Sequence, residues 1–451
     1  MFVDGAFYGA TAQNLAEGYG NIWQLSPTQN PIARPFFGHP PLVIWLLSVL
    51  MTCTNNAFWT ERLFSIFCLL LLIWGIIRLW KITNPASTPA SSWLIGLLWL
   101  MIPINLWAYS QLMLENLLTA AVIWSISFGI KASLHPFKWF KYSLLASFWL
   151  IIGTLCKGPV GLFPLVIFGS YWLVFRSISF FQMLRNSLVL VSCLVGFYVL
   201  LYLGSVDAAH YFSTYFSGQL KGSLSGSNNI NPNRFYVLEV LLIEAVAWWI
   251  LALLYLVVRK KPITTSPWFW FFILLGLSAS LPILISPKQM KFYLIPAFAC
   301  LAIAMAHLFF PIIQHWISLR KTPPTKVSYF VFHGLLLASF LLSISRYNGY
   351  ARDKEKIQEI EKLITTIPPQ SKVIMQSNKV DYIAEFYFVR LGYILVNNYE
   401  WQPNWEAERA NPTPYLLIEK DYHSRFEPYY LPDTSSNKQL RIWNLYRPQK
   451  Q

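Results

Sequence analysis

Long apolar stretches separated by short polar connectors fill the chain from about residue 59 to residue 346. Runs of about 17 to 25 apolar residues can cross a bilayer, because an α-helix rises about 1.5 Å per residue. The pattern predicts about ten transmembrane helices, near residues 59–80, 92–109, 114–131, 142–157, 159–175, 186–204, 236–258, 268–286, 292–313 and 328–346. The shorter apolar stretch at 39–53 begins with two prolines and predicts a helix lying at the membrane interface.

The pattern changes after residue 346, where apolar and polar positions alternate as they do in soluble proteins. This region predicts helices at 352–367 and 380–391, and strands at 371–377, 392–398, 414–420 and 439–447. The predicted fold is therefore an all-α polytopic membrane bundle followed by a small α/β domain. We assign residues 1–346 to the transmembrane domain, with 1–58 as an outer loop carrying interfacial helices, and residues 347–451 to the soluble domain.

Composition agrees with a membrane protein, since 55% of the residues are hydrophobic and only 12% are charged. Soluble proteins carry about a quarter charged residues. Up to Arg346 the chain has 21 Lys and Arg against seven Asp and Glu, and afterwards 14 against 13. The positive surplus lies in the connectors between apolar stretches, which is typical of membrane topology and excludes a nucleic-acid-binding face. The five cysteines are scattered singly, so no disulfide or thiolate metal site is predicted.

The basic connectors also predict the orientation of the chain in the membrane. Alternate connectors hold 13 of the 21 cationic residues, and basic connectors stay in the cytoplasm. The first predicted span then runs inward, which places Asp4 and the C-terminal domain on the extracytoplasmic side. We expect a multi-pass protein of the cytoplasmic (inner) membrane, and the short loops between spans indicate a bacterial source.

Two carboxylates are the strongest catalytic candidates. Asp4 stands at the start of a short helix in the first outer loop, and Glu115 begins the third predicted span. Ionisable groups near a membrane are costly and usually functional, and two carboxylates on one face suit a general base, or a base with a metal or cation ligand. Helix capping is the competing interpretation for both residues.

Four other acidic residues within 1–346 have structural interpretations. Glu17 fits the polar face of a short interfacial helix, and Glu61 can pair with the adjacent Arg62. Glu239 and Glu244 serve equally well as partners within the bundle or as functional groups.

Three of the lysines on the predicted outer side, which break the general bias, are candidates for binding an anion. Lys157 lies in a Gly-Pro turn between two spans, while Lys288 and Lys291 precede a span, next to Tyr293. Interfacial snorkelling explains such lysines, and a phosphate site facing the membrane explains them as well.

The order of several motifs resembles the polytopic class C glycosyltransferases. Within that class it is most similar to the bacterial branch related to dolichyl-phosphate-mannose-protein mannosyltransferases (protein O-mannosyltransferases) and to the aminoarabinose transferases of lipid A. The resemblance covers roughly residues 1–315 and rests on VDGAFYGATAQNLA, FGHPPLVIWL, TERLFS, SQLMLEN, GTLCKGPVGLFPL and SPKQMKFYLIPAF.

The resemblance implies transfer of a sugar from a polyprenyl-phosphate donor to an extracytoplasmic acceptor, a glycolipid, lipopolysaccharide or protein, with inversion at the anomeric carbon. By position it assigns Asp4 as the base that activates the acceptor and Glu115 as the second acid. No cofactor is certain, but a divalent cation at Asp4 and Glu115 is a candidate. The substrate-binding candidates are Tyr8, His39, Lys157, Lys288, Lys291 and Tyr293.

The chain departs from this family in two places. The aminoarabinose transferases have an acidic-basic pair where this chain has Gly38 and His39, and the family has a transmembrane helix before the first acid. We therefore expect Met1 to be an internal start or the chain to be a fragment. Two other functions remain open: a transporter or flippase of lipid-linked sugars, and a non-catalytic envelope assembly protein.

Overall fold

The computed structural model describes residues 3–28, 35–57, 59–85, 92–226, 231–259, 265–318, 353–377, 381–398, 412–422 and 429–448. The contacts divide the chain into two units. The first consists of Met1–Phe36, Ile44–Glu61 and Asn348–Gln451, and the second of Phe37–Val43 and Arg62–Tyr347. The predicted span at 328–346 lies outside the described residues.

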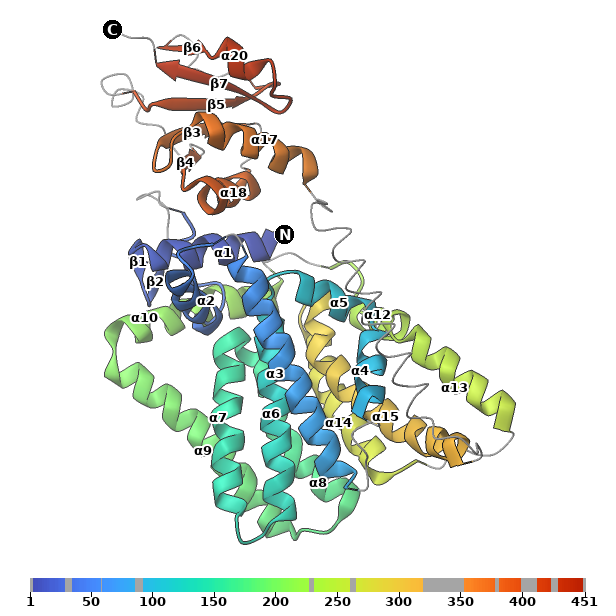
Figure 1. Ribbon diagram of the computed structural model, residues 1–451. Coiled ribbons are helices and arrows are strands. Elements are labelled where there is room, and N and C mark those ends of the chain that lie inside the picture. The colour runs from blue at the N-terminus through green and yellow to red at the C-terminus, as the bar shows by residue number, and fades with distance from the viewer. Residues whose placement is uncertain are drawn as a thin grey trace. The chain divides into compact units, whose positions relative to one another are not determined.

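The second unit is a helical bundle (Figure 1). Its helices, in chain order, are α3 (Thr60–Thr83, whose first two residues belong to the first unit), α4 (Ser92–Leu100), α5 (Pro103–Ser110), α6 (Leu114–Leu134), α7 (Trp139–Lys157), η2 (Gly158–Val166), α8 (Ile167–Phe175), α9 (Phe180–Gly204), α10 (Val206–Thr214), η3 (Tyr215–Leu220), α11 (Lys221–Ser225), α12 (Tyr236–Glu244), α13 (Val246–Arg259), α14 (Pro267–Ser280), η4 (Leu281–Ile285), η5 (Lys291–Leu294) and α15 (Ile295–Ser318).

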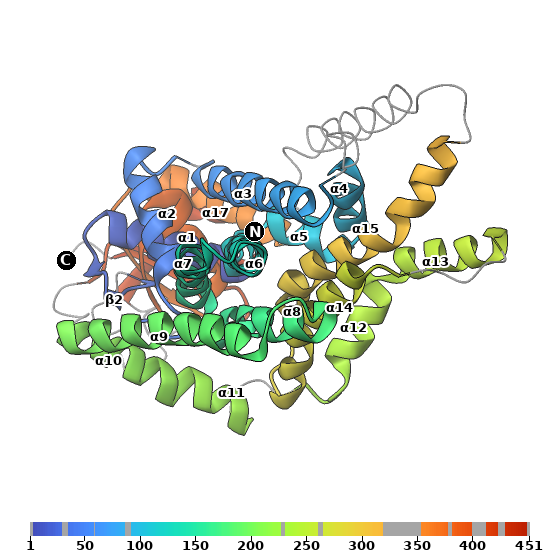
Figure 2. The same cartoon turned by 90° about the horizontal axis from the view of Figure 1, so that it is seen from below.

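Six helical stretches among the described residues are long and apolar enough to cross a membrane, or seven if α12 and α13 form one bent span. Figure 2 views α6 and α7 end-on, side by side in the bundle. In the Lys291–Pro311 stretch, which includes most of α15, 94% of the 18 consecutive residues with the highest hydropathy are buried. In α9 the corresponding share is only 6%. Apolar side chains that point outward are suited to lipid, so this multi-pass membrane protein has α6 and α15 inside and α9 at its periphery.

Two predicted spans are broken in the structure. The 92–109 segment divides into α4 and α5, because Pro103 lacks an N–H and cannot continue the preceding helix. The 236–258 segment bends by 53° between α12 and α13. At this bend Glu244 accepts a hydrogen bond from the backbone N–H of Ile104 at 3.0 Å, in the first turn of α5. The interpretation of Glu244 as a partner within the bundle therefore fits the structure.

The predicted pair of spans at 142–157 and 159–175 forms one 37-residue helical stretch, Trp139–Phe175. Its two arms nevertheless run in opposite directions. The Cα of Gly161 lies 3.8 Å from where a Cβ of Gly153 would be, although eight residues of continuous α-helix would separate them by about 12 Å. The chain reverses at Gly158, whose φ is +67°.

The C-terminal part of the first unit confirms the predicted α/β domain. Its elements are α17 (Lys354–Thr366), β3 (Lys372–Gln376), α18 (Tyr382–Gly392), β4 (Leu395–Asn398), β5 (Tyr415–Glu419), β6 (Tyr430–Pro432), α20 (Thr434–Asn437) and β7 (Trp443–Pro448). The strand order is β4-β3-β5-β7-β6, with β3 parallel to β4 and β5, and β7 antiparallel to β5 and β6. The short strand β6 and helix α20 were not predicted from the sequence.

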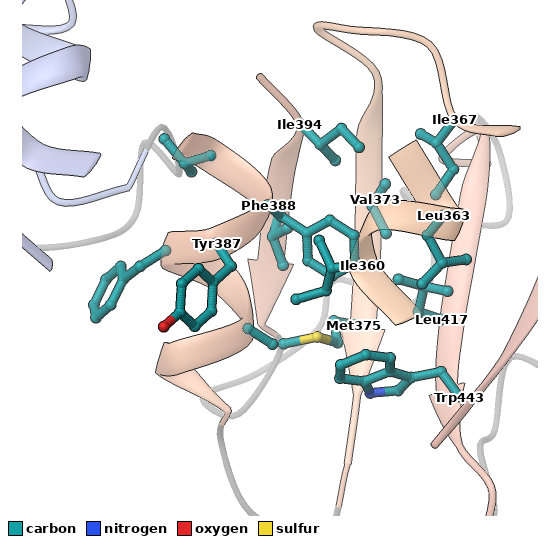
Figure 3. Packing of buried hydrophobic residues seen from close by; sticks show 14 of the residues in the cluster. Ile360, Leu363, Ile367, Val373, Met375, Tyr387, Phe388, Ile394, Leu417 and Trp443 are labelled. Carbon is teal, nitrogen blue, oxygen red and sulfur yellow. The ribbon is translucent and has the colours of Figure 1, made fainter. Parts of the chain in front are cut away.

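Alternating residues of the strands build the core of this domain (Figure 3). Val373 and Met375 of β3 pack with α17 and α18, while Ile374 joins a smaller cluster with Leu416. Since successive side chains of a strand point to opposite faces, both helices cover the same face of the sheet. Glu359 of α17 is buried, and its carboxylate accepts hydrogen bonds of 2.8–2.9 Å from the backbone N–H groups of residues 441–443.

The N-terminal segment belongs to the same unit as this domain, which differs from its predicted place in the transmembrane domain. Its elements are α1 (Val3–Ala16), β1 (Gly20–Asn21), β2 (Gln24–Leu25) and α2 (Leu42–Cys53), whose last ten residues belong here. Ala6 and Ala10 of α1 lie in the core cluster of the C-terminal domain, and the rings of Phe7 and Phe386 are 5.1 Å apart. Small side chains let α1 approach α18 closely, a packing that a sequence pattern cannot reveal.

A buried ion pair joins the segments of this unit. Arg390 of α18 binds the carboxylate of Glu61 in bidentate fashion, so Glu61 does not depend on the adjacent Arg62. The same guanidinium donates to the backbone oxygens of Asn56 and Ala57 at 2.9 and 2.7 Å. Arg390 and Glu61 are 5% and 4% exposed. Such a pair depends on each partner, because either charge alone would be buried without compensation.

Candidate functional site

A buried ion pair forms the centre of the candidate site. Glu115 lies in the first turn of α6 and Lys157 is the last residue of α7, and the Lys157 ammonium donates to Oε1 of Glu115. The side chains are 0% and 5% exposed. Because α6 and α7 are antiparallel neighbours, the start of one helix meets the end of the other. Glu115 thus has an ionic role that the capping interpretation does not include.

Two aromatic rings lie against Lys157. Its Nζ is 4.5 Å from the ring centroid of Tyr293 and 5.0 Å from that of Phe292, both in η5. Trp107 of α5 stacks on Phe292, with centroids 6.2 Å apart, and the Nζ of Lys291 is 5.5 Å from the Trp107 ring. A cation is attracted to the face of an aromatic ring. The structure therefore brings the KGP turn together with the stretch before the LIP motif, as the predicted site requires.

The backbone at Lys157 is held by a glycine that no other residue can replace without strain. Gly158 has φ +67° and ψ −133°, a conformation that L-residues rarely adopt. A Cβ on Gly158 would lie 2.2 Å from the hydroxyl oxygen of Tyr215 in η3. Tyr215 therefore packs directly on the turn that follows Lys157, and both residues determine where the ammonium is placed.

A buried glutamine holds the loop that carries Lys288 and Lys291. Gln289 accepts a hydrogen bond from the backbone N–H of Val237 at 3.1 Å and donates to the backbone oxygen of Arg234 at 2.9 Å. The hydroxyl of Ser286 accepts a hydrogen bond from the N–H of Lys288 at 3.1 Å. The two lysines are thus carried by a fixed loop.

His39 lies within the electrostatic reach of the same lysines. Burial, followed by the positive charges of Lys157 and Lys288, lowers the pKa of His39 well below its usual value of 6.5. The hydroxyl of Tyr211 in α10 donates to the backbone oxygen of His39 at 2.7 Å. The neutral ring of His39 is therefore favoured at pH 7, and a neutral ring still has one N–H that can donate to a phosphate oxygen.

Several residues of this site were not selected from the sequence. Asn116 follows Glu115 and donates to the backbone oxygens of Ala108 and Gln111, which fixes the start of α6. Asn116 lies in the SQLMLEN motif, and Gln289 and Phe292 lie in SPKQMKFYLIPAF. Their place in these motifs was the one indication in the sequence that they belong to the site. Trp107 and Tyr215 carry no comparable signal, because they approach the site only through the tertiary fold.

Asp4 and Tyr8 belong to the other unit. Asp4 lies in the first turn of α1, and Tyr8 is buried on the next turn. A carboxylate in the first turn of a helix is favoured by the helix dipole, so the capping interpretation of Asp4 stays open beside the catalytic one.

The surroundings of Glu115 do not suit the divalent cation considered from the sequence. Its carboxylate is held by Lys157, and the neighbouring titratable groups named above are cationic or neutral. Among the described residues there is no cluster of three or more His, Cys, Asp or Glu side chains that could hold a metal ion. A site rich in lysine attracts an anion more strongly than a divalent cation, which prefers several oxygen ligands.

No protein-family model matches the sequence, and no curated protein matches it. Solved structures are similar to this chain. ArnT from Cupriavidus metallidurans bound to undecaprenyl phosphate has a TM-score of 0.66 at 15% identity, covering 98% of this chain and 93% of ArnT. Apo ArnT from the same organism has a TM-score of 0.65 at 14% identity, covering 98% and 92%.

The oligosaccharyltransferase from Archaeoglobus fulgidus, in complex with Zn and sulfate, has a TM-score of 0.50 at 12% identity. That match covers 92% of this chain and 64% of the oligosaccharyltransferase. At such identities the similarity is one of fold, and it confirms the fold expected from the motifs. The chain has the fold of the polytopic class C glycosyltransferases.

Proposed function

We propose that this protein is a membrane glycosyltransferase that moves a sugar from a polyprenyl-phosphate donor to an acceptor hydroxyl, with inversion at the anomeric carbon. One observation carries the proposal: buried Lys157 is held by Glu115 beside Tyr293, in a fold shared with an ArnT structure that contains undecaprenyl phosphate. Lys157 and Lys288 both lie close enough to His39 for their charges to lower its pKa. The proposed location is the inner membrane, with the site on the extracytoplasmic side.

The lysines are suited to binding the phosphate of the donor. An ammonium carries three N–H donors, so a lysine that is held by one carboxylate can still bind a phosphate oxygen. Glu115 fixes the position of Lys157 but also offsets its charge, which leaves Lys288 and Lys291 to supply the net positive charge. Fixed cations stabilise the negative charge that develops on the leaving phosphate, more strongly in a buried site than in water.

In the proposed reaction the acceptor hydroxyl oxygen attacks the anomeric carbon from the face opposite the phosphate. The bond between the anomeric carbon and the phosphate oxygen breaks, and its electron pair stays on the polyprenyl phosphate. Asp4 takes the hydroxyl proton, since a carboxylate within hydrogen-bond reach can act as the general base. Tyr8 and His39 are proposed to contact the substrates, and the acceptor is a glycolipid, lipopolysaccharide or protein.

The test is a transfer assay with the full chain in membranes. Undecaprenyl-phosphate pentoses and hexoses with a radiolabelled sugar are incubated with lipid and protein acceptors, and acceptor label is counted. We expect Asp4→Asn to reduce labelling at least about 100-fold, the usual size of a general-base contribution. Asp207→Asn is the matched control, because Asp207 is an exposed aspartate in the first turn of another helix, α10.

Two results would contradict the proposal. Donor that moves between leaflets without labelling any acceptor would identify a flippase. Acceptor labelling that survives both Asp4→Asn and Lys157→Met would show that the transfer comes from another protein in the membranes.

A further inference from the structure

A second cationic site lies in the bundle, far from Lys157. A pocket of about 350 Å³ is lined by Trp74, Ile77, Arg78, Lys81, Ile82 and Lys131. Its volume falls within the range of small-molecule sites, roughly 300 to 1,000 Å³. Three of its six lining residues are cations and none is an acid, so the pocket carries a positive charge that its own walls do not balance.

The pocket lies at the opposite end of the bundle from the candidate active site. The indole N–H of Trp124 on α6 donates to the backbone oxygen of Leu71 on α3, and Arg78 of α3 donates to Ser127 of α6. The later residue of α3, Arg78, pairs with the later residue of α6, Ser127, so the two helices run parallel. Their last turns therefore lie at the same end, with Lys131 sixteen residues after Glu115, or about 24 Å along the helix. This distance approaches the hydrocarbon thickness of a bilayer, about 30 Å.

Aromatic side chains hold the cations of the pocket in place. The guanidinium carbon of Arg78 is 4.4 Å from the ring centroid of Phe128 and 5.0 Å from that of Trp124. The Nζ of Lys131 is 5.7 Å from the centroid of the Tyr142 ring. Stacking fixes the plane of a guanidinium, and with one N–H given to Ser127 others can bind an acceptor. The arrangement is preorganised for an anion.

The apolar part of the pocket indicates what kind of anion fits. Trp74 is 62% exposed, and Ile77 and Ile82 are half-buried, so apolar groups stand beside the three cations. A free phosphate would contact only the cations, whereas a phospholipid offers a phosphate and acyl chains together. Basic pockets between transmembrane helices bind anionic lipid headgroups. We propose that this pocket binds the phosphate of an anionic phospholipid in the leaflet opposite the active site.

The experiment measures lipid binding to the purified full chain by native mass spectrometry. The probes are phosphatidylglycerol and phosphatidylcholine with identical acyl chains, and inorganic phosphate is titrated as a competitor. We expect preferential binding of phosphatidylglycerol, and about 30-fold weaker binding in Arg78→Gln/Lys131→Gln, from the usual contribution of two cations near an anionic surface. The control is Lys138→Gln/Lys141→Gln, which removes two exposed lysines beside the start of α7 at the same end.

Three outcomes would overturn the proposal. Equal weakening in both double variants would mean diffuse attraction to the surface, and equal binding of the two lipids would remove the selectivity for an anionic headgroup. Displacement of lipid by inorganic phosphate would make free phosphate the ligand. Because Arg78 also stacks on the core, Lys81→Gln/Lys131→Gln provides a second test that leaves this stacking intact, and it should lose binding to a similar extent.

Discussion

Replacing Glu115 and Lys157 singly and together separates their structural role from their catalytic one. The carboxylate is 0% exposed and the lysine side chain 5%, so either single Met variant leaves a charge buried without its partner. Removing one member of a buried pair costs about 3–5 kcal/mol, whereas replacing both by apolar side chains of similar volume is close to neutral. The double variant should therefore be more stable than either single variant.

The stability of each variant is measured as the midpoint of thermal unfolding of the purified chain. We expect each single variant to lower the midpoint by on the order of 5–10 °C and the double variant to recover most of that loss. Transfer should behave differently. Losing a cation that stabilises the leaving phosphate costs roughly 100- to 1,000-fold in rate, and the double variant cannot recover it.

Lys221→Met, which removes an exposed lysine, is the control for a change of net charge. The reasoning is refuted if the double variant regains transfer together with stability, because the pair would then be a structural element alone. It is also refuted if both single variants unfold at the wild-type midpoint, because the pair would then not be buried as described.

Three further predictions follow from individual contacts. Gly158→Ala should lower the free energy of unfolding by about 1–3 kcal/mol through backbone strain, and the new methyl group should also clash with Tyr215. Adding Tyr215→Phe should relieve the clash and leave the strain, and midpoints of thermal unfolding measure both effects. Arg390→Met should destabilise the chain by about 3–5 kcal/mol, and adding Glu61→Met should reverse most of the loss in the same assay. Burial lowers the pKa of His39 below 6.5, so the unfolded chain takes up the proton first and His39 contributes a loss of stability of about 1.4 kcal/mol per pH unit below pH 6.5. His39→Gln should make the measured slope of unfolding free energy against pH shallower by that amount.

The elements of the fold were largely predictable, because hydrophobic periodicity reports which faces are buried. The tail illustrates this: the helix expected at 352–367 is α17, and the strand expected at 371–377 is β3. Breaks inside apolar segments were harder to predict. The divided 92–109 segment contains a visible signal, Pro103. At the bend after α12, Glu244 instead accepts a hydrogen bond from the N–H of Ile104, which is more than a hundred residues away in the chain.

The candidate site shows the same division. Lys157 and Glu115 could be selected from the sequence because charges are rare in apolar segments and costly to bury there. Their pairing could not be selected, since it depends on α6 and α7 running antiparallel. For Glu61 the sequence indicated the wrong partner: Arg62 is adjacent in the chain, but Arg390 binds the Glu61 carboxylate.

The sequence by itself determined that this is a polytopic membrane protein with a small α/β domain at its C-terminal end, and it singled out the charged residues of the candidate site. Composition and periodicity are sufficient for this, because burial and membrane insertion act on each segment locally. Only the tertiary structure decided which charges meet: Glu115 with Lys157, Glu61 with Arg390, and Arg78 with Lys131 in one basic pocket. Coulomb interactions and hydrogen bonds depend on distance in space, which helix packing sets and sequence separation does not.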